Sequence, residues 1–182
     1  MWIIILLGVL AVIAFYVVSV YNGLVNARNK VRDQFSQIDV QLKRRFDLIP
    51  NLVETVKGYA KHESETLEKV IQARNNYANA KTEAEKVAAS NEMSRGVMNI
   101  MALAESYPDL KANINFVDLQ NQLKDIEEKI SYARSFYNDT VLMYNNKVEM
   151  FPSNLVASMF KFNKEAFFEA DEKERENVQV KF

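Results

Sequence analysis

Mostly apolar residues recur at alternating steps of four and three between residues 24 and 59. The repeating positions are Leu24, Arg28, Val31, Phe35, Ile38, Leu42, Arg45, Ile49, Leu52, Val56 and Tyr59. This spacing is typical of a helix that packs lengthwise against other helices. Pro50 lies inside the pattern, and the repeat continues in phase beyond it. The sequence therefore predicts a helix that is kinked at Pro50 and does not end there.

A second long repeat of the same kind lies nearer the C-terminus. Its positions are Leu119, Leu123, Ile126, Ile130, Ala133, Tyr137, Val141, Tyr144, Val148 and Phe151. Two shorter amphipathic patterns lie between the long repeats, and short connections favour antiparallel neighbours. The sequence therefore predicts an all-α fold with an up-down antiparallel four-helix bundle over residues 22–151. The expected helices span about 22–61, 63–80, 83–106 and 109–150.

The first residues form an apolar run that carries no charged side chain before Arg28. As a helix, the run from Trp2 to Val20 would span roughly 28 Å, which is close to the thickness of a bilayer core. A cleaved signal peptide is the alternative, but no basic residue precedes the run and no convincing cleavage site follows it. We therefore predict that residues 1–21 are a single transmembrane anchor whose helix continues into the bundle.

The distribution of charge predicts the orientation of this anchor. Only the terminal amine precedes the span, whereas Arg28, Lys30 and Arg32 follow it. The positive-inside rule then places the N-terminus outside and residues 22–182 in the cytoplasm.

Composition argues against catalysis and against nucleic-acid binding. The chain has no Cys and one His, which excludes disulfides and thiolate metal sites and leaves a di-iron bundle without its ligands. That single His has no Ser partner at a useful spacing, so a Ser-His-Asp site has no support. A net charge of -1 gives no electrostatic case for nucleic acid. We predict no enzymatic activity, no catalytic residue, no metal site and no cofactor.

Arg28, Asp39 and Arg45 are polar or charged residues on or beside the first apolar repeat. In one interpretation they form buried ion pairs that fix the register of the helices. In the other, they line a ligand or partner pocket between helices. The acidic partners considered on the last long helix are Asp118, Asp125 and Glu128.

The C-terminal segment, residues 152–182, is rich in aromatic and charged residues. Ser153 is placed to cap a short helix that runs through Met159. The aromatic side chains are predicted to pack on their own bundle, to contact a neighbouring protomer, or to contact the membrane. The contact candidates are Phe151, Phe160, Phe162, Phe167 and Phe168. Residues 171–176 form a charged tail, and residues 178–182 alternate in the manner of a short strand.

Two blocks of the sequence carry a family resemblance. The first includes Ser36–Arg45, Asp47–Val53 and Val56–Ala60, and the second is Phe151–Ala157 followed by Phe160 and Phe162. Both blocks resemble the signatures of the LemA family of bacterial membrane proteins, and the resemblance covers nearly the whole chain. It implies one N-terminal membrane helix, a helical-bundle domain and a place in the bacterial inner membrane. The family has no established enzymatic activity and is associated with envelope maintenance.

Together these patterns predict a non-enzymatic, membrane-anchored protein that self-associates as a scaffold or membrane organiser in envelope maintenance or stress. The expected partners are membrane lipids and further copies of the chain. An adaptor that presents a membrane protease, a signalling partner or another stress-response protein is the alternative. A small-ligand sensor built around Arg28, Asp39 and Arg45 is a third hypothesis.

Overall fold

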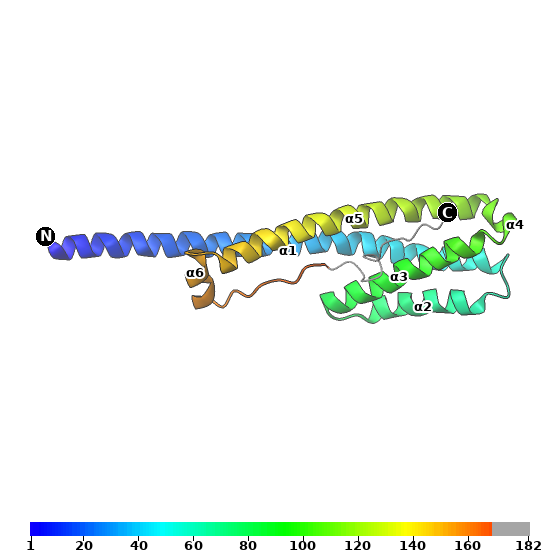
Figure 1. The fold of residues 1–182 in the computed structure, drawn as a ribbon, viewed down its shortest axis with the longest axis horizontal. Helices are drawn as coiled ribbons and strands as arrows, with labels where there is room; N and C mark the ends of the chain where they lie inside the picture. The colour runs from blue at the N-terminus through cyan, green and yellow to red at the C-terminus, as the bar shows by residue number, and fades with distance from the viewer. Residues whose placement is uncertain (169–182) are drawn as a thin grey trace, which may run out of the picture. The chain divides into compact units, whose positions relative to one another are not determined.

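The structure, a computed structural model, describes residues 1–168, and every regular element in that range is a helix (Figure 1). The elements are α1 (Trp2–Lys57), α2 (Ser64–Asn79), α3 (Glu83–Ala104), α4 (Pro108–Lys111), α5 (Ile114–Glu149) and α6 (Ser153–Met159). The all-α prediction is therefore confirmed. The predicted charged tail and terminal strand lie outside the described residues.

The predicted fourth helix is divided in the structure into α4 and α5. Pro108 occupies the first position of α4, where its missing N–H leaves no helical hydrogen bond unmade. Helix α4 ends at Lys111, and α5 begins directly after Asn113. The side-chain oxygen of Asn113 accepts a hydrogen bond from the backbone N–H of Phe116 at 3.1 Å. This contact satisfies one of the free donors at the start of α5. The prediction of one continuous helix over residues 109–150 was therefore wrong, because a second start at Asn113 follows the one at Pro108.

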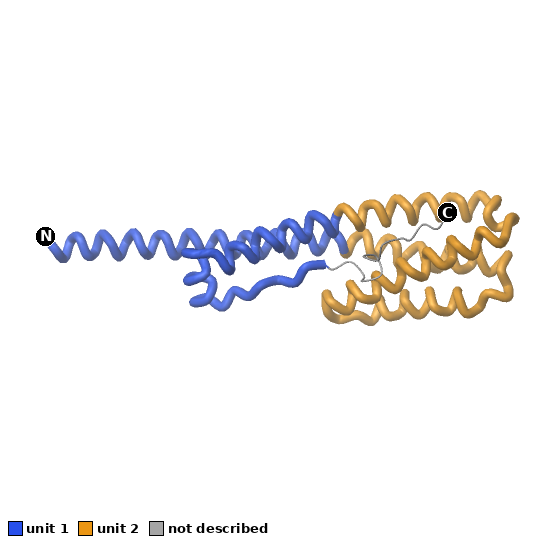
Figure 2. Tube along the Cα trace, in the orientation of Figure 1, with its two compact units in different colours: residues 1–38, 133–168 blue, residues 39–132, 169–182 orange. Residues whose placement is uncertain are grey.

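The helices of the described chain group into two compact units (Figure 2). The first unit comprises residues 1–38 and 133–168, and the described part of the second comprises residues 39–132. Both α1 and α5 contribute to each unit. The predicted four-helix bundle over residues 22–151 therefore stays a prediction, because the structure describes that range in two parts.

The first apolar repeat is buried in both units. Its buried members are Leu24, Val31, Phe35 and Ile38 in the first unit and Leu42, Ile49, Leu52 and Val56 in the second. Helix α1 passes through Pro50, which is exposed, and ends at Lys57. Pro50 therefore lies within the helix as expected, and the kink itself remains a prediction.

In the second unit, α2 and α3 pack closely at Gly96. A Cβ atom built on Gly96 would lie 2.8 Å from Cγ2 of Val70 and 3.5 Å from its Cα. Val70 is fully buried on α2 and Gly96 is buried on α3. The glycine inside α3 thus allows close helix contact despite its low helix propensity.

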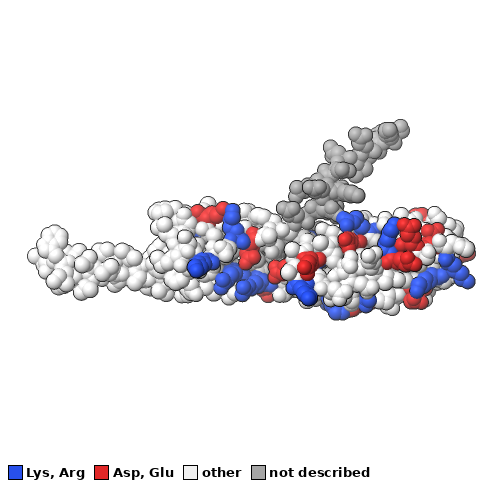
Figure 3. Space-filling model, turned by 90° about the horizontal axis from the view of Figure 1, so that it is seen from below, with Lys and Arg blue, Asp and Glu red and all other residues white. Residues whose placement is uncertain are grey.

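The N-terminal part of α1 is uncovered. Among residues 1–168, α1 is the one helix that is long and apolar enough to cross a membrane, with a mean hydropathy of 3.0 over its most apolar window. None of that window is buried. In Figure 3 this end of the molecule shows no charged side chain. These properties are compatible with a single-pass membrane anchor.

Candidate functional site

Arg45 is the centre of a buried polar cluster in the second unit. Its side chain is completely buried on α1. One terminal nitrogen donates to the Ser94 hydroxyl and to Glu127 Oε1, the latter at 2.7 Å. The other donates to the backbone oxygen of Ser90 at 2.8 Å and to its hydroxyl at 2.7 Å. The Arg45 side chain therefore connects α1 with α3 and α5 through its hydrogen bonds.

The acidic partner of Arg45 is not one of the three that the sequence suggested. Glu127 on α5 forms the ion pair, whereas Asp125 pairs with Lys129 at 2.6 Å one turn away on the same helix. Glu127 keeps 37% of its side chain exposed, while Arg45 keeps none. The pair is thus asymmetric, with a buried cation and an anion that still reaches water. Its position depends on the rotation of α5, which apolar spacing alone specifies too loosely.

Asp39 takes part in a second polar group of the same unit. Its Oδ1 accepts hydrogen bonds from the Tyr77 hydroxyl and from Lys86 Nζ, both at 2.9 Å. Burial, and then the hydrogen bond and charge of Asp39, raise the pKa of Tyr77 above its ordinary value of 10.0. Tyr77 therefore remains a donor at neutral pH. Asp39 on α1 therefore contacts both α2 and α3, as the register interpretation expects, and the choice between register and ligand pocket stays a prediction.

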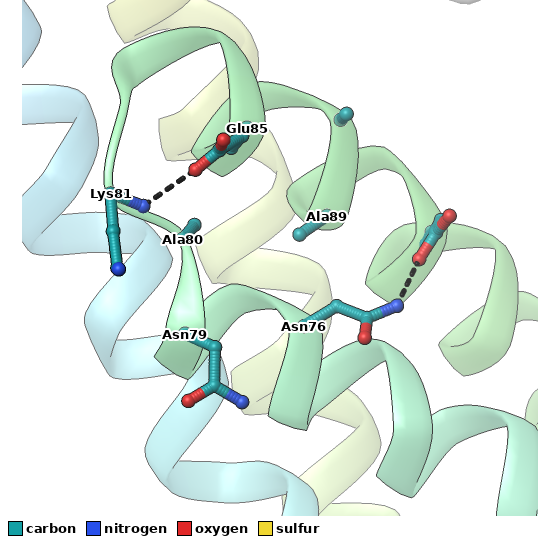
Figure 4. Close-up of a pocket in the computed structure, with 8 residues that line it drawn as sticks. Asn76, Asn79, Ala80, Lys81, Glu85 and Ala89 are labelled. Carbon is teal, nitrogen blue, oxygen red and sulfur yellow. Dashed lines mark hydrogen bonds between the residues drawn. The ribbon is translucent and has the colours of Figure 1, made fainter.

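A surface groove lies between α2, α3 and their connection (Figure 4). It has a volume of about 510 Å³, and its wall combines amide and charged side chains with Ala80, Ala88 and Ala89. Asn76 donates to Glu92 at 3.1 Å across it, and Glu85 accepts a hydrogen bond from the backbone N–H of Lys81 at 2.7 Å. Helix α3 begins here with a capping box between Thr82 and Glu85. The groove can offer hydrogen bonds to a polar surface, but its acids are already paired with the chain itself.

Arg28, the third polar candidate, lies in the first unit and not with the other two. Its guanidinium stands over the ring of Phe162, 5.0 Å from the centroid. Phe162 also contacts Tyr21, with ring centroids 5.7 Å apart. The predicted Arg28–Asp39–Arg45 pocket is therefore not assembled within either unit. Arg28 instead helps to hold the C-terminal segment on α1.

Two asparagines on α5 hold the chain that follows α6. The side-chain amide of Asn145 exchanges two hydrogen bonds with the backbone of Glu165, both at 2.9 Å. Asn138 does the same with Phe168, at 3.1 and 2.8 Å. Seven helical residues rise about 10.5 Å, and three extended residues cover about 10 Å. The two lengths match, so two asparagines seven residues apart on one face of a helix can both bind the backbone of one extended segment.

Two tyrosines preceding these asparagines complete the arrangement. The Tyr137 hydroxyl donates to the backbone oxygen of Ala166 at 3.0 Å, and that of Tyr144 donates to Asn163 at 2.9 Å. Burial and the nearby Glu165 carboxylate raise the pKa of Tyr144. This Tyr–Asn repeat is visible in the sequence at residues 137–138 and 144–145, but its role is evident only from the structure.

The five aromatic contact candidates differ in exposure. Phe162 and Phe168 are 7% and 5% exposed and pack on their own unit, which was one of the predicted alternatives. Phe151, Phe160 and Phe167 are 79%, 47% and 47% exposed. These three are therefore the more accessible of the five, and a contact of any of them beyond the chain stays a prediction.

The part of α5 in the first unit, together with Met150 directly after it, also presents an uncovered apolar stripe. Phe136, Met143 and Met150 recur every seven residues and are 62%, 68% and 61% exposed. The buried side of the same helix carries Tyr137, Val141 and Tyr144. We call the three exposed residues the α5 stripe. In residues 1–168, no group of three His, Cys, Asp or Glu side chains could hold a metal ion.

Comparison with known proteins identifies the family. The LemA family model matches residues 34–182. The chain belongs to the LemA family. Protein LemA of Metamycoplasma hominis is 30% identical to it over 181 residues, which cover 97% of this chain and 82% of that protein. The residues matched by the family model include the Arg45 cluster, the Tyr–Asn repeat and the α5 stripe, and they cover the first compact unit from residue 34 onward.

Proposed function

We propose that this LemA family protein is a non-enzymatic, membrane-anchored helical scaffold that self-associates in the plane of the bilayer. The N-terminal part of α1 would cross the bacterial inner membrane once, with the N-terminus outside and the remaining chain in the cytoplasm. The uncovered apolar window of α1 supports the anchor, and the cations that follow it support the orientation. The polar clusters would give the helices a fixed register, so that a rigid surface is presented to neighbours.

The α5 stripe is the observation that carries self-association. Phe136, Met143 and Met150 repeat with the period of helices that pack side by side, yet nothing in the described chain covers them. Tyr137, Val141 and Tyr144 on the other face of α5 are buried. Helix α5 is therefore apolar on two faces, one covered by its own chain and one uncovered. Anchoring restricts copies to a plane and raises their effective concentration, which favours pairing of two such stripes.

Site-specific cross-linking tests this pairing, because the natural chain contains no Cys. A single Met143→Cys variant in native membranes should form a disulfide-linked dimer of twice 21.0 kDa under mild oxidation. Because both copies would be anchored at the same end, their α5 helices would run parallel on either side of a two-fold axis. The same residue of both copies would then face its counterpart across that axis.

Leu142→Cys is the matched control. Leu142 is 50% exposed and adjacent in sequence, but it lies about 100° around the helix from Met143. It should cross-link much less. Equal yields from the two variants would indicate random collision, and a monomer in both would exclude pairing through the α5 stripe. Light scattering of detergent-solubilised wild type gives an independent measure, because a monomer of 21.0 kDa at micromolar concentration contradicts self-association.

An adaptor role is the second candidate, and the α2–α3 groove favours it. Amide, charged and alanine side chains line a groove of about 510 Å³, a mixed surface that would suit an amphipathic segment of another protein. Affinity purification of wild type and an Asn76→Ala variant separates the two roles. An adaptor should recover a defined second protein at stoichiometry that the variant loses, whereas a scaffold should recover its own chain from both.

A further inference from the structure

A second uncovered apolar surface surrounds α6. Its members are Phe151, Leu155, Met159 and Phe160, which are 79%, 61%, 68% and 47% exposed; we call them the α6 patch. Leu155 and Met159 are four residues apart and share the outer face of α6, while Val156 and Ala157 form its buried face. Val156 and Ala157 are enough to pack α6 on the rest of its unit. The exposed Leu155 and Met159 take no part in that packing.

The α6 patch lies beside the end of the apolar run of α1. The ring of Phe160 contacts the ring of Tyr21, with centroids 4.8 Å apart and planes at 60°. Tyr21 directly follows the run that ends at Val20. Both rings belong to the first compact unit, so this contact fixes where α6 lies along α1.

Burial along α1 gives the same position independently. Residues 2–16 are exposed, Val17 and Val20 are half-buried, and Leu24 is 1% exposed. Protein therefore begins to cover α1 within the last turn of the apolar run. If lipid surrounds the exposed residues of α1, the protein that covers α1 begins at the edge of the bilayer, level with Val17 and Val20.

Charge is arranged as a bilayer interface requires. Residues 150–160 carry no charged side chain, and the first cation after them is the exposed Lys161. Farther along the segment, Lys164 pairs with Glu149 at 2.8 Å. In Figure 3 the surface beside the uncharged N-terminal helix is also free of charge, and charged side chains begin beyond it. Lys at the edge of an apolar surface can reach lipid phosphates while its stem stays in the apolar layer.

We propose that the α6 patch inserts into the headgroup–acyl boundary of the same bilayer that α1 crosses. This inference rests on the membrane anchoring in the proposed function and adds a second membrane contact to it. A lipid surface is favoured over a second copy because the patch adjoins the part of α1 that lipid must already surround. Interfacial insertion of short apolar surfaces of this kind requires no pocket, only apolar side chains with polar or cationic neighbours.

The second contact would limit rotation of the first unit about the axis of α1. A single transmembrane helix leaves that rotation free, whereas two contact points on the bilayer do not. The α5 stripe belongs to the same unit and would then keep a constant direction in the membrane plane. Neighbouring copies could pair without first losing that rotational freedom, which lowers the entropic cost of association.

Tryptophan quenching by lipids measures the insertion directly. The natural chain has one Trp, at position 2, so a Trp2→Phe background is free of tryptophan. In this background, Leu155→Trp replaces an exposed side chain and should not disturb the fold. In vesicles with lipids spin-labelled near the headgroup, it should lose most of its emission. Labels near the chain ends should quench it much less, because the site is shallow.

Phe136→Trp in the same background is the matched control. Phe136 is 62% exposed, similar to Leu155, and its neighbour Tyr137 contacts Phe35 with ring centroids 5.8 Å apart. Phe35 lies fourteen residues beyond Tyr21, or about 21 Å along the helix. The control should therefore be quenched by neither label. Met159→Trp repeats the test at a second position if the first variant expresses poorly.

The outcomes separate this inference from the proposed function. Quenching of natural Trp2 without quenching of Leu155→Trp and Met159→Trp would overturn the inference and leave the anchor intact. Absence of Trp2 quenching would overturn the anchor and the inference together. If Leu155→Cys instead forms a disulfide-linked dimer in membranes while the Trp variants stay unquenched, a second copy covers the α6 patch and the lipid contact is excluded.

Discussion

Removing Glu127 should destabilise the protein more than removing the arginine with which it pairs. Arg45 is completely buried, whereas Glu127 is 37% exposed. In Glu127→Ala the guanidinium stays in the core with its neutralising charge gone. In Arg45→Met an apolar side chain of similar length fills the space, and the remaining carboxylate can turn to water. The cost therefore depends on which charge is left behind.

The structure sets the size of each effect. Leaving a buried charge unpaired costs about 3–5 kcal/mol. Here Ser90 and Ser94 keep three hydrogen bonds to Arg45, so we expect about 2–3 kcal/mol for Glu127→Ala. Arg45→Met loses those bonds but also avoids the desolvation of a cation whose Nε is buried without a partner. We expect about 1 kcal/mol or less for that change.

Circular dichroism of the full chain in detergent, followed on heating, gives the order. At about 2–4 °C per kcal/mol for a chain of this size, Glu127→Ala should lower Tm by about 4–12 °C and Arg45→Met by less than about 4 °C. The double variant Arg45→Met/Glu127→Ala should melt above Glu127→Ala alone, because the unpaired charge is gone. Glu128→Ala, an exposed neighbour, is the control and should change Tm little.

Two results would refute this reasoning. One is a larger loss for Arg45→Met than for Glu127→Ala, which would mean that the hydrogen bonds outweigh the buried charge. The other is a double variant no more stable than Glu127→Ala, which would mean that Arg45 and Glu127 are not coupled. A double-mutant cycle with all four proteins measures this coupling.

Three further predictions follow from other contacts. Gly96→Ala should lower stability by about 1–2 kcal/mol in thermal unfolding, since its Cβ meets Val70, whereas Gly23→Ala, with nothing within 4 Å, should be neutral or stabilising; equal effects would contradict close packing at Gly96. Asn145→Ala should free the segment after α6, seen as faster amide exchange over residues 163–168 with exchange in α2 unchanged, and unchanged exchange in both would exclude this role. Because the pKa of Tyr77 is raised in the folded protein, its stabilising contribution is complete below pH 10.0 and is lost as pH rises above that value. Tyr77→Phe should therefore lose less stability than wild type between neutral pH and high pH, and parallel curves would argue against the shift.

The two uncovered surfaces give the LemA family protein different capacities. The α5 stripe has the period of a helix–helix contact, while the α6 patch lies at the end of the apolar run of α1. Exposed apolar area of this kind marks contacts with other molecules when it is contiguous. In the proposed scaffold, the α5 stripe would join copies and the α6 patch would orient them on the membrane.

The amino-acid sequence by itself determined the helical fold and the apolar N-terminal helix. Helix periodicity is a local property, so the repeats of α1 and α5 could be predicted from spacing alone. A short helix ending at Met159 was also predicted, but its predicted cap was wrong: Pro152 holds the cap position, and Ser153 is the first residue of α6, where its hydroxyl donates to the backbone oxygen of Met150 at 2.9 Å. The apolar members of the α1 repeat from Leu24 to Val56 are buried as their spacing required, whereas Arg28 is half-buried and Tyr59, beyond the end of α1, is 41% exposed. Charge and length along residues 1–21 indicated an anchor, because bilayer thickness sets a simple length rule.

The tertiary structure alone decided which polar residues meet. Apolar spacing fixes the face of a helix to within a residue or two, but an ion pair depends on the rotation and axial position of two helices together. Glu127 and not Asp125 or Glu128 therefore pairs with Arg45, and Arg28 stacks on Phe162 in the other unit. The same reason applies to the C-terminal segment, where the match between a helical rise and an extended backbone decides which aromatic side chains are buried and which stay exposed.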